Sequence, residues 1–110
     1  TYLQDAPYHQ GKIDNPSSTS TIIPLMNILR DEVCVKRNKK IFFRTWLSFD
    51  TNLTTFLAVS DAVEPHPNLI WSIKHVEGDF HRGNAYSKVM GRGRHPFIVE
   101  VQAAREYEGK

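Results

Sequence analysis

The alternation of apolar and polar positions divides the chain into two helices and three strands. Apolar side chains recur at helical spacing over residues 19–37 and 52–63, which predicts two amphipathic helices. Short apolar runs rich in β-branched and aromatic residues predict strands over 40–47, 68–75 and 97–103. Helices that alternate with such strands indicate a parallel sheet of the α/β class.

Two segments that contain glycine, proline and polar residues, 1–18 and 81–95, are predicted to be loops. We expect Pro24 near the first turn of the first helix, because a proline in a helix interior removes a backbone donor. Asp50 or Thr51 is expected to cap the second helix, since either side chain can accept a hydrogen bond from its first N–H groups.

Polar side chains cluster where each predicted strand ends. Arg44 lies near the end of the first strand, Lys74–Asp79 follow the second, and Gln102–Glu106 follow the third. Parallel strands place their carboxyl ends at one edge of a sheet, so these clusters should converge there. The pattern is typical of a (β/α)8 TIM barrel, and we expect residues 1–110 to be a single fragment that forms consecutive staves of such a barrel.

Composition narrows the class of partner. The chain has 110 residues and a formal net charge of +2, which is too small to favour a nucleic acid or an anionic membrane. No apolar run is long enough to span a membrane, and the single cysteine, Cys34, excludes an internal disulfide. We expect Cys34 to be buried in the first helix. Because the sequence begins at Thr1 rather than at a methionine, we also expect it to be part of a longer protein.

The converging residues include two carboxylates, Asp79 and Glu106, and two cations, Arg44 and Lys74. Paired carboxylates can activate a water molecule for attack on the acetal carbon of a glycoside. Cations beside them would bind an acidic group of the substrate, and arginine can do so with two parallel hydrogen bonds. This combination points to hydrolysis of a sugar that bears a carboxylate. The alternative interpretation is a simple ion pair between Arg44 and Asp79, without catalysis.

The sequence from Lys40 to Tyr107 resembles the catalytic region of the family-67 α-glucuronidases. Three strings carry the resemblance: F-R-T-W at Phe43–Trp46, the I-K and G-D-F within Ile73–Phe80, and V-E-V-Q-A-A-R-E-Y at Val99–Tyr107. The resemblance implies a TIM-barrel glycoside hydrolase that releases a (4-O-methyl)glucuronic acid from xylan fragments with inversion of configuration.

The resemblance also implies a role for each charged residue. Asp79 and Glu106 match the carboxylates with general-base duty, and Lys74 and Arg44 match the cations that bind the uronate carboxylate. No metal or cofactor is implied. The run Val76–Gly78 and the basic loop that follows depart from the family pattern, which implies a different uronic acid or a different aglycone.

The general acid is not found where the family places it. The resemblance implies a glutamate on the strand before the one that carries Arg44, whereas Glu32 lies in the first predicted helix. We therefore expect the acid to lie N-terminal to Thr1. The isolated chain should then be inactive, because it cannot protonate the leaving group.

Four alternating side chains offer a second chemistry. His75, Glu77, Asp79 and His81 would lie on one face of an extended strand, and such ligands can bind Zn²⁺ or Mn²⁺. Gly78 interrupts the alternation, so we expect no metal. His75 is assigned instead to hydrogen bonding within the substrate site.

Further substrate contacts are expected from the first loop. Asp5 and Tyr8 combine a carboxylate with an aromatic ring, which suits contacts with sugar hydroxyls and with the face of a sugar ring. Packing within the loop is the alternative. Trp46 is expected either in the core or in a substrate subsite, whereas its position in the second strand favours the core for Trp71.

Glu100 should lie on the inward face of the third strand, where a carboxylate needs a partner such as Arg44 or Lys74. The basic residues of the long loop could bind a phosphate backbone, but we favour a role in covering the site. These residues are Arg82, Lys88, Arg92 and Arg94.

These residues favour part of an inverting glycoside hydrolase that releases a glucuronic-acid-type sugar from xylan or a related polysaccharide. The expected partner is a uronic-acid-containing oligosaccharide, with no nucleic acid and no membrane. The alternative is a non-catalytic carbohydrate-binding or interaction domain built from barrel staves. Unpaired strand edges are also expected to allow oligomer formation.

Overall fold

The computed structural model describes residues 18–46, 48–78, 80 and 83–103. Its elements follow the chain in the order α2 (Ser18–Leu29), the π-helix η2 (Arg30–Val35), β1 (Ile41–Arg44), α3 (Ser48–Thr51), α4 (Leu53–Ala62), β2 (Leu69–Lys74) and β3 (Phe97–Glu100). Among the described helices, none has the length and apolar character needed to cross a membrane.

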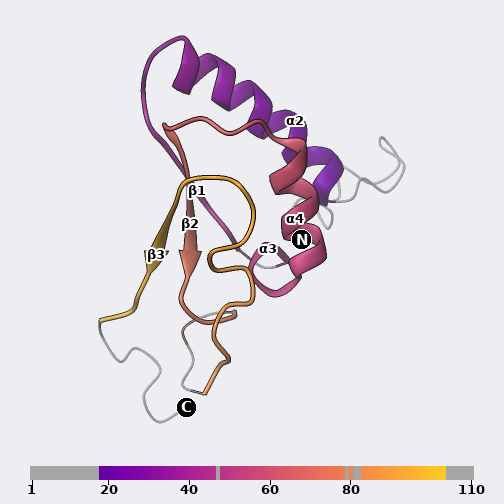
Figure 1. Ribbon diagram of the computed structural model, residues 1–110, viewed down its shortest axis with the longest axis vertical. Coiled ribbons are helices and arrows are strands. Elements are labelled where there is room, and N and C mark those ends of the chain that lie inside the picture. Colours follow the sequence, from indigo (N-terminus) through magenta and orange to yellow (C-terminus); the bar gives the residue numbers. More distant parts are fainter. Residues whose placement is uncertain (1–17, 47, 79, 81–82, 104–110) are drawn as a thin grey trace, which may run out of the picture.

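The three strands form one parallel sheet in the order β1-β2-β3, so the predicted parallel α/β architecture is confirmed. β1 connects to β2 through α3 and α4. β2 connects to β3 through a long segment in which the structure describes turns and one antiparallel bridge, between Val76 and Tyr86. Figure 1 shows β2 and β3 running in the same direction, with α4 beside the sheet and α2 crossing above it. The sheet is open, and a closed barrel would require further strands.

The first predicted helix is an α-helix followed directly by a π-helix that ends at Val35. The wider turn is seen in the hydrogen bond from Lys36 N–H to the carbonyl of Asp31 (3.1 Å). Pro24 lies inside α2 rather than in its first turn, so that expectation was wrong. Pro24 lies on the exposed side of the helix. Cys34 is buried, as predicted.

The remaining predicted elements are present with shorter bounds. β1 ends at Arg44 because the chain then turns into α3, a single helical turn that the apolar pattern did not indicate. The cap of α4 is Asn52, whose side chain accepts a hydrogen bond from Thr55 N–H (3.1 Å). Asp50 and Thr51 were therefore the wrong candidates, because residue type alone does not choose among three adjacent capping residues.

The core lies between α4 and one face of the sheet, with Trp71 of β2 at its centre. The indole ring packs edge-on against Phe56 of α4 (ring centroids 5.0 Å apart) and against Phe43 of β1 (5.1 Å). Trp71 is 1% exposed, which confirms its predicted core position. The other buried apolar residues of this core are Met26, Cys34, Phe49, Val59, Val63, Leu69, Ile73 and Val89.

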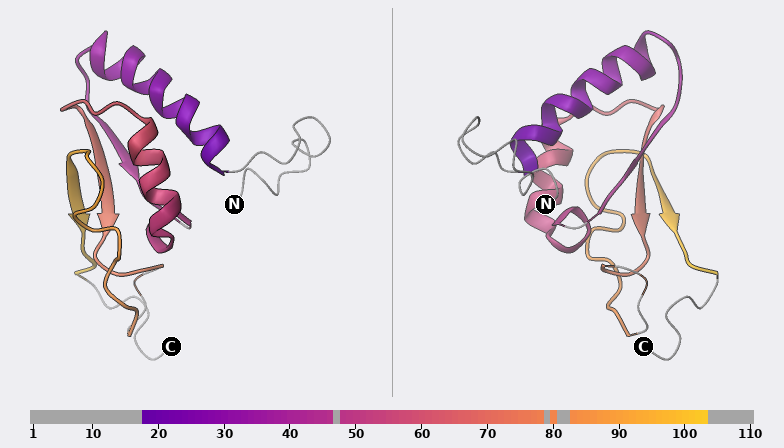
Figure 2. Two further views of the ribbon diagram at one scale, coloured as in Figure 1. Left: turned by 45° about the vertical axis from the view of Figure 1, so that its right-hand side comes forward. Right: turned by 180° about the vertical axis from the view of Figure 1, so that it is seen from behind.

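The opposite face of the sheet has no described helix over it. Figure 2 shows α2 and α4 on the same side of the sheet. Phe42 of β1 and Ile98 of β3 point away from the core and are 56% and 45% exposed. Paired positions of parallel strands share a face, so this open face also carries Arg44, Ser72 and Glu100.

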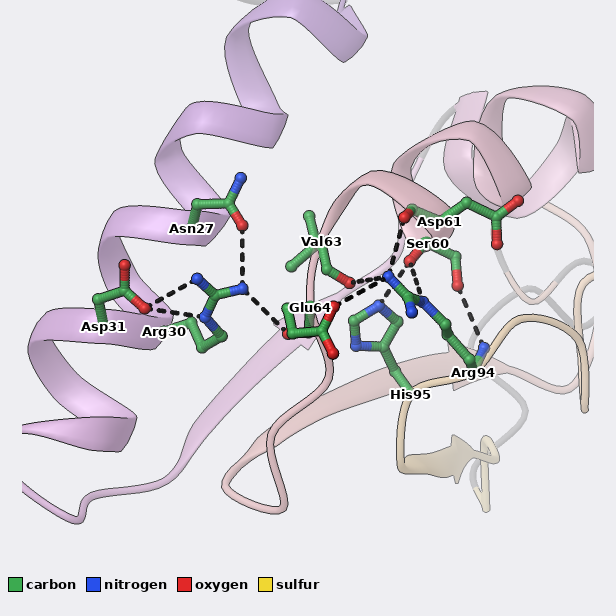
Figure 3. Close-up of polar contacts among 9 residues, drawn as sticks. All are labelled: Asn27, Arg30, Asp31, Ser60, Asp61, Val63, Glu64, Arg94 and His95. Carbon is green, nitrogen blue, oxygen red and sulfur yellow. Dashed lines mark hydrogen bonds and ion pairs between the residues drawn. The ribbon is translucent and has the colours of Figure 1, made fainter.

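Arg94 fastens the segment before β3 to the end of α4 (Figure 3). Its guanidinium donates to the carbonyls of Asp61 (2.9 Å) and Val63 (3.3 Å), and its backbone N–H donates to the hydroxyl of Ser60 (3.2 Å). The last carbonyls of a helix lack intrahelical partners, and a cation there also meets the negative end of the helix dipole. Arg94 therefore stabilises the attachment of this segment to α4, and the role of the long loop in covering the site stays a prediction.

A second arginine, at the start of η2, connects the first helical segment to the residues that follow α4. Arg30 donates to the carbonyl of Glu64 (3.3 Å) and to the side chain of Asn27 (3.2 Å), and it pairs with Asp31 (2.8 Å). In Figure 3, Arg30 and Arg94 approach Glu64 from opposite sides. The two guanidinium groups therefore join α2, α4 and the segment before β3.

Gly93 permits the contact with α4, because a side chain there would collide with the Ser60 hydroxyl. Its backbone has φ +77°, a conformation that favours glycine.

We predict that Gly93→Ala lowers the free energy of unfolding by about 2 kcal/mol or more, measured by urea denaturation. Gly91→Ala is the matched control, since Gly91 has φ +73° but nothing within 4 Å of an added Cβ. Gly91→Ala should lower the free energy of unfolding by only about 1 kcal/mol, the cost of a side chain at positive φ. Equal decreases in the two variants would contradict the prediction.

His95 is buried and stacked on Trp71, with ring centroids 4.6 Å apart. Its Nε2 lies 3.0 Å from the carbonyl of Ser60, and its Nδ1 has no hydrogen-bond partner among the described residues. Burial is the largest effect on the pKa of His95 and lowers it below the ordinary value of 6.5. The hydrogen bond with the carbonyl of Ser60 opposes this, the charge of Arg94 adds to it, and Glu64 and Val63 oppose it more weakly. The folded protein therefore takes up this proton less readily than the unfolded chain.

Stability should fall as the pH drops below about 6.5, because the unfolded chain then binds a proton at this position that the folded chain does not. Above that pH, His95 is neutral in both states and its contribution is constant. We predict that His95→Phe, which keeps an aromatic ring over Trp71, flattens the decline in unfolding free energy as the pH falls below about 6.5. Urea denaturation at each pH gives the slope of unfolding free energy against pH for the wild type and for the variant. Equal slopes would contradict the assignment to His95.

Candidate functional site

Each of the three strands ends in a charged residue, and the structure brings these residues to one edge of the sheet. β1 ends at Arg44, β2 at Lys74 and β3 at Glu100. Lys74 is paired in register with Glu100 and Arg44 with Ser72, so all four side chains belong to the same face. We call Arg44, Ser72, Lys74 and Glu100, together with Trp46, the strand-end cluster. Arg44 and Lys74 thus lie where the sequence analysis expected them, and their role in binding a substrate stays a prediction.

Glu100 holds Arg44 in a two-point ion pair that reaches across β2. Nε of Arg44 lies 2.9 Å from both carboxylate oxygens, and Nη2 lies 2.8 Å from Oε2. Ser72, on the strand between them, donates its hydroxyl to Oε1 (2.6 Å). The carboxylate therefore links all three strands. The expectation that Glu100 needs a cationic partner is confirmed, and Arg44 is that partner.

These contacts keep Glu100 ionised. Burial by itself would raise the pKa of the carboxyl, but the hydrogen bonds from Arg44 and Ser72 and the charges of Arg44 and Lys74 outweigh it, and the pKa lies below the ordinary 4.5. The side chain of Arg44 is 55% exposed and that of Glu100 is 22% exposed. Solvent therefore screens the pair, and its net contribution to stability is about 1 kcal/mol or less. The main effect of the pair is to fix the orientation of the guanidinium.

Lys74 is fully buried, and aromatic rings surround its ammonium group. Nζ lies 3.5 Å from the centroid of the Trp46 ring and 5.8 Å from that of Phe80. It also donates to the carbonyl of Gly78, whose φ of +67° turns the chain back toward the strand end. The ring face and the carbonyl oxygen take the place of the water molecules that the ammonium group gives up when it is buried.

Trp46 contacts both cations of the cluster. The guanidinium carbon of Arg44 lies 5.3 Å from the centroid of the same ring that Lys74 approaches. At 38% exposure, Trp46 belongs to the rim of the cluster rather than to the core. The choice left open by the sequence is therefore resolved against a core position.

His75 joins the ends of β2 and β3. Its backbone N–H donates to the carbonyl of Glu100 (3.0 Å), and its ring Nδ1 lies 3.2 Å from the same oxygen. The imidazole also stacks on Phe80, with ring centroids 5.7 Å apart. These contacts give His75 a hydrogen-bonding role between β2 and β3, and its expected role in the substrate site stays a prediction.

The alternating set considered for a metal is divided between described and undescribed positions. Glu77 Oε1 lies 3.3 Å from Nζ of Lys88, so these two side chains form an ion pair. Within the part of the chain that the structure describes, no group of three His, Cys, Asp or Glu side chains is placed to hold a metal ion. Asp79 and His81 lie outside the described residues.

Four of the predicted site residues cannot be located relative to the cluster, because they lie outside the described residues. They are the carboxylates Asp79 and Glu106 and the first-loop residues Asp5 and Tyr8. Sequence reasoning also missed Ser72, which binds Glu100. A small hydroxyl residue inside an otherwise apolar, buried strand was the signal that could have identified it.

The cluster is suited to attract a small anion. It carries two cations and one carboxylate, and opposite charges attract strongly near a partly desolvated surface. In the structure, Nε and Nη2 of Arg44 are bound to Glu100, and Lys74 is covered by Trp46. A ligand carboxylate would therefore approach over the Trp46 ring or exchange with Glu100.

Comparisons with known proteins add no family assignment. No model of a known family, no curated protein and no solved structure matches the chain.

We predict that Trp46 and Lys74 are energetically coupled by about 1–2 kcal/mol. A double-mutant cycle with Trp46→Leu and Lys74→Met measures this coupling by urea denaturation, since methionine keeps an unbranched side chain, one heavy atom shorter, but lacks the charge. Trp46→Tyr is the control, and it should retain part of the coupling because tyrosine keeps an electron-rich ring. Additive losses in the Trp46→Leu cycle would show that the ring does not stabilise the ammonium group.

Proposed function

We propose that this chain is part of an inverting glycoside hydrolase that releases a glucuronic-acid-type sugar from xylan or a related polysaccharide. In this proposal the sheet contributes consecutive staves to a (β/α)8 barrel, and its open face lines the barrel interior. Arg44 binds the uronate carboxylate, and Lys74, which is buried beneath Trp46, adds the attraction of its charge. Asp79 or Glu106 activates the attacking water, as the resemblance to the family-67 α-glucuronidases implies.

The observation that supports this proposal best is the meeting of Arg44 and Lys74 at Trp46. The two cations come from neighbouring strands, and the indole ring lies 5.3 Å from one and 3.5 Å from the other. Two cations beside a partly exposed ring suit a sugar acid, because the charges attract the carboxylate and the ring offers a flat apolar surface to the sugar. The carboxyl ends of parallel strands are also where barrel enzymes carry their active sites.

The proposed reaction divides its tasks between binding and proton transfer. An inverting glycosidase needs a base that activates water on one face of the sugar and an acid that protonates the leaving oxygen. Arg44, assisted by the charge of Lys74, would hold the uronate so that its anomeric carbon faces the water activated by Asp79 or Glu106. No residue of the chain is assigned as the acid, so we propose that the chain alone binds the substrate without hydrolysing it.

A non-catalytic carbohydrate-binding domain is the second candidate. The ion pair between Arg44 and Glu100 favours it, because the protein's own carboxylate already binds two of the donors that a uronate would use. Such a domain would rely on the exposed part of Trp46 to hold a sugar ring. It would not distinguish an acidic oligosaccharide from a neutral one.

Binding of two matched oligosaccharides to the 110-residue chain separates these candidates. We predict that a xylo-oligosaccharide with one 4-O-methylglucuronic acid branch binds about tenfold more tightly than the same oligosaccharide without the branch. Isothermal titration calorimetry measures both affinities. Arg44→Gln should abolish this preference, because it removes the charge while keeping a polar side chain.

Lys39→Gln is the matched control for this experiment. Lys39 is an exposed cation that precedes β1, at the opposite end of the strand from Arg44. Removal of the Lys39 charge should change the affinity for neither the branched nor the unbranched oligosaccharide. Equal binding of the two oligosaccharides by the wild-type chain would favour the carbohydrate-binding domain, and failure to bind either one would contradict both candidates.

A further inference from the structure

Glu100 is the residue through which the parts of the strand-end cluster are connected. Its carboxylate accepts hydrogen bonds from Arg44 of β1 and from Ser72 of β2. Its backbone carbonyl accepts the N–H of His75, the residue after β2 (3.0 Å). The resemblance that suggested roles for Arg44 and Lys74 suggests none for Glu100, so its function has to be inferred from these contacts.

Arg44 depends on Glu100 for a fixed orientation. More than half of its side chain is exposed, and an arginine that lacks a partner samples many rotamers at a surface. The two-point pair binds one edge of the guanidinium, and Trp46 lies against it at 5.3 Å. A guanidinium held in one plane is prepared to bind a planar carboxylate, because less side-chain entropy is lost when the ligand arrives.

Ser72 keeps open the path between Glu100 and Arg44. It lies on the central strand between the two residues, and its hydroxyl donates to Oε1 at 2.6 Å. A larger side chain at this position would fill the space across which Glu100 reaches β1. The small size and the donor of Ser72 therefore both favour the pair.

We propose that Glu100 is a positioning residue that fixes the Arg44 guanidinium and makes the strand-end cluster selective for a single carboxylate over a doubly charged anion such as phosphate. The identity of the carboxylate ligand rests on the proposed function. Glu100 also offsets one of the two positive charges of the cluster. Since Coulomb energy grows with the product of the charges, this offset weakens the attraction for a dianion more than that for a monoanion.

The test compares the 110-residue wild-type chain with Glu100→Gln by ¹⁵N NMR. Glutamine has the same shape as glutamate but lacks the charge and replaces one acceptor oxygen with a donor. We expect the Nε–H signal of Arg44 to be protected from exchange with water in the wild type and to exchange rapidly in the variant. Affinity for sodium glucuronate should fall about tenfold, whereas affinity for inorganic phosphate should stay constant or rise.

Two further variants complete the experiment. Glu77→Gln is the matched control, because Glu77 is a carboxylate at the same end of the sheet that pairs with Lys88 instead of Arg44. It should leave the Arg44 signal and both affinities unchanged. Ser72→Ala removes one hydrogen bond to Glu100 without altering the charge, and it should weaken glucuronate binding by a smaller factor. It provides the test if Glu100→Gln does not fold.

Three outcomes are decisive. An unchanged Arg44 signal with an unchanged ratio of glucuronate to phosphate affinity in Glu100→Gln would overturn the inference. An equal loss of affinity for both anions would also overturn it, because a purely structural defect affects both alike. If the wild type binds no glucuronate but the Arg44 signal still changes in the variant, the positioning role is supported and the proposed function fails.

Discussion

The packing of Trp71 holds the described fold together, because helix, sheet and loop all meet at its indole ring. Phe56 brings α4 to it, Phe43 belongs to the neighbouring strand, and His95 stacks on it from the segment before β3. A three-stranded sheet has little apolar surface of its own to bury, so one large ring in the central strand gives these elements a common core. A substitution that displaces this ring would therefore also weaken the packing of the segment before β3, which Arg94 attaches to α4.

β2 carries the core and the candidate site on alternate residues. Trp71 and Ile73 lie on the face that packs against α4, whereas Ser72 and Lys74 lie on the opposite face and belong to the strand-end cluster. The cluster therefore takes its rigidity from the core, since Ser72 cannot shift without moving the backbone on either side of it. This arrangement is what a binding site needs, because charged groups that are already in place lose less entropy when a ligand arrives.

Sequence patterns predicted the parts of the structure that depend on periodicity, and they failed where a single contact decides. Apolar runs were enough to predict the parallel strands and the burial of Trp71. The π-helix and the Asn52 cap depend on individual hydrogen bonds, which residue spacing does not reveal. The sequence also left open whether Arg44 or Lys74 pairs with Glu100. That choice depends on the strand register and on the space above Ser72, which only the three-dimensional structure supplies.

The pair between Arg44 and Glu100 joins residues that are 56 positions apart, and this separation bears on the order of assembly. Contacts between distant segments form late in folding, because closing a long loop costs entropy before the contact can stabilise it. During synthesis, Arg44 and Lys74 leave the ribosome before Glu100 does. A nascent chain that ends before β3 would therefore carry both cations without the carboxylate that offsets them. Under the role inferred above for Glu100, selectivity among anions would arise only when the last strand joins the sheet.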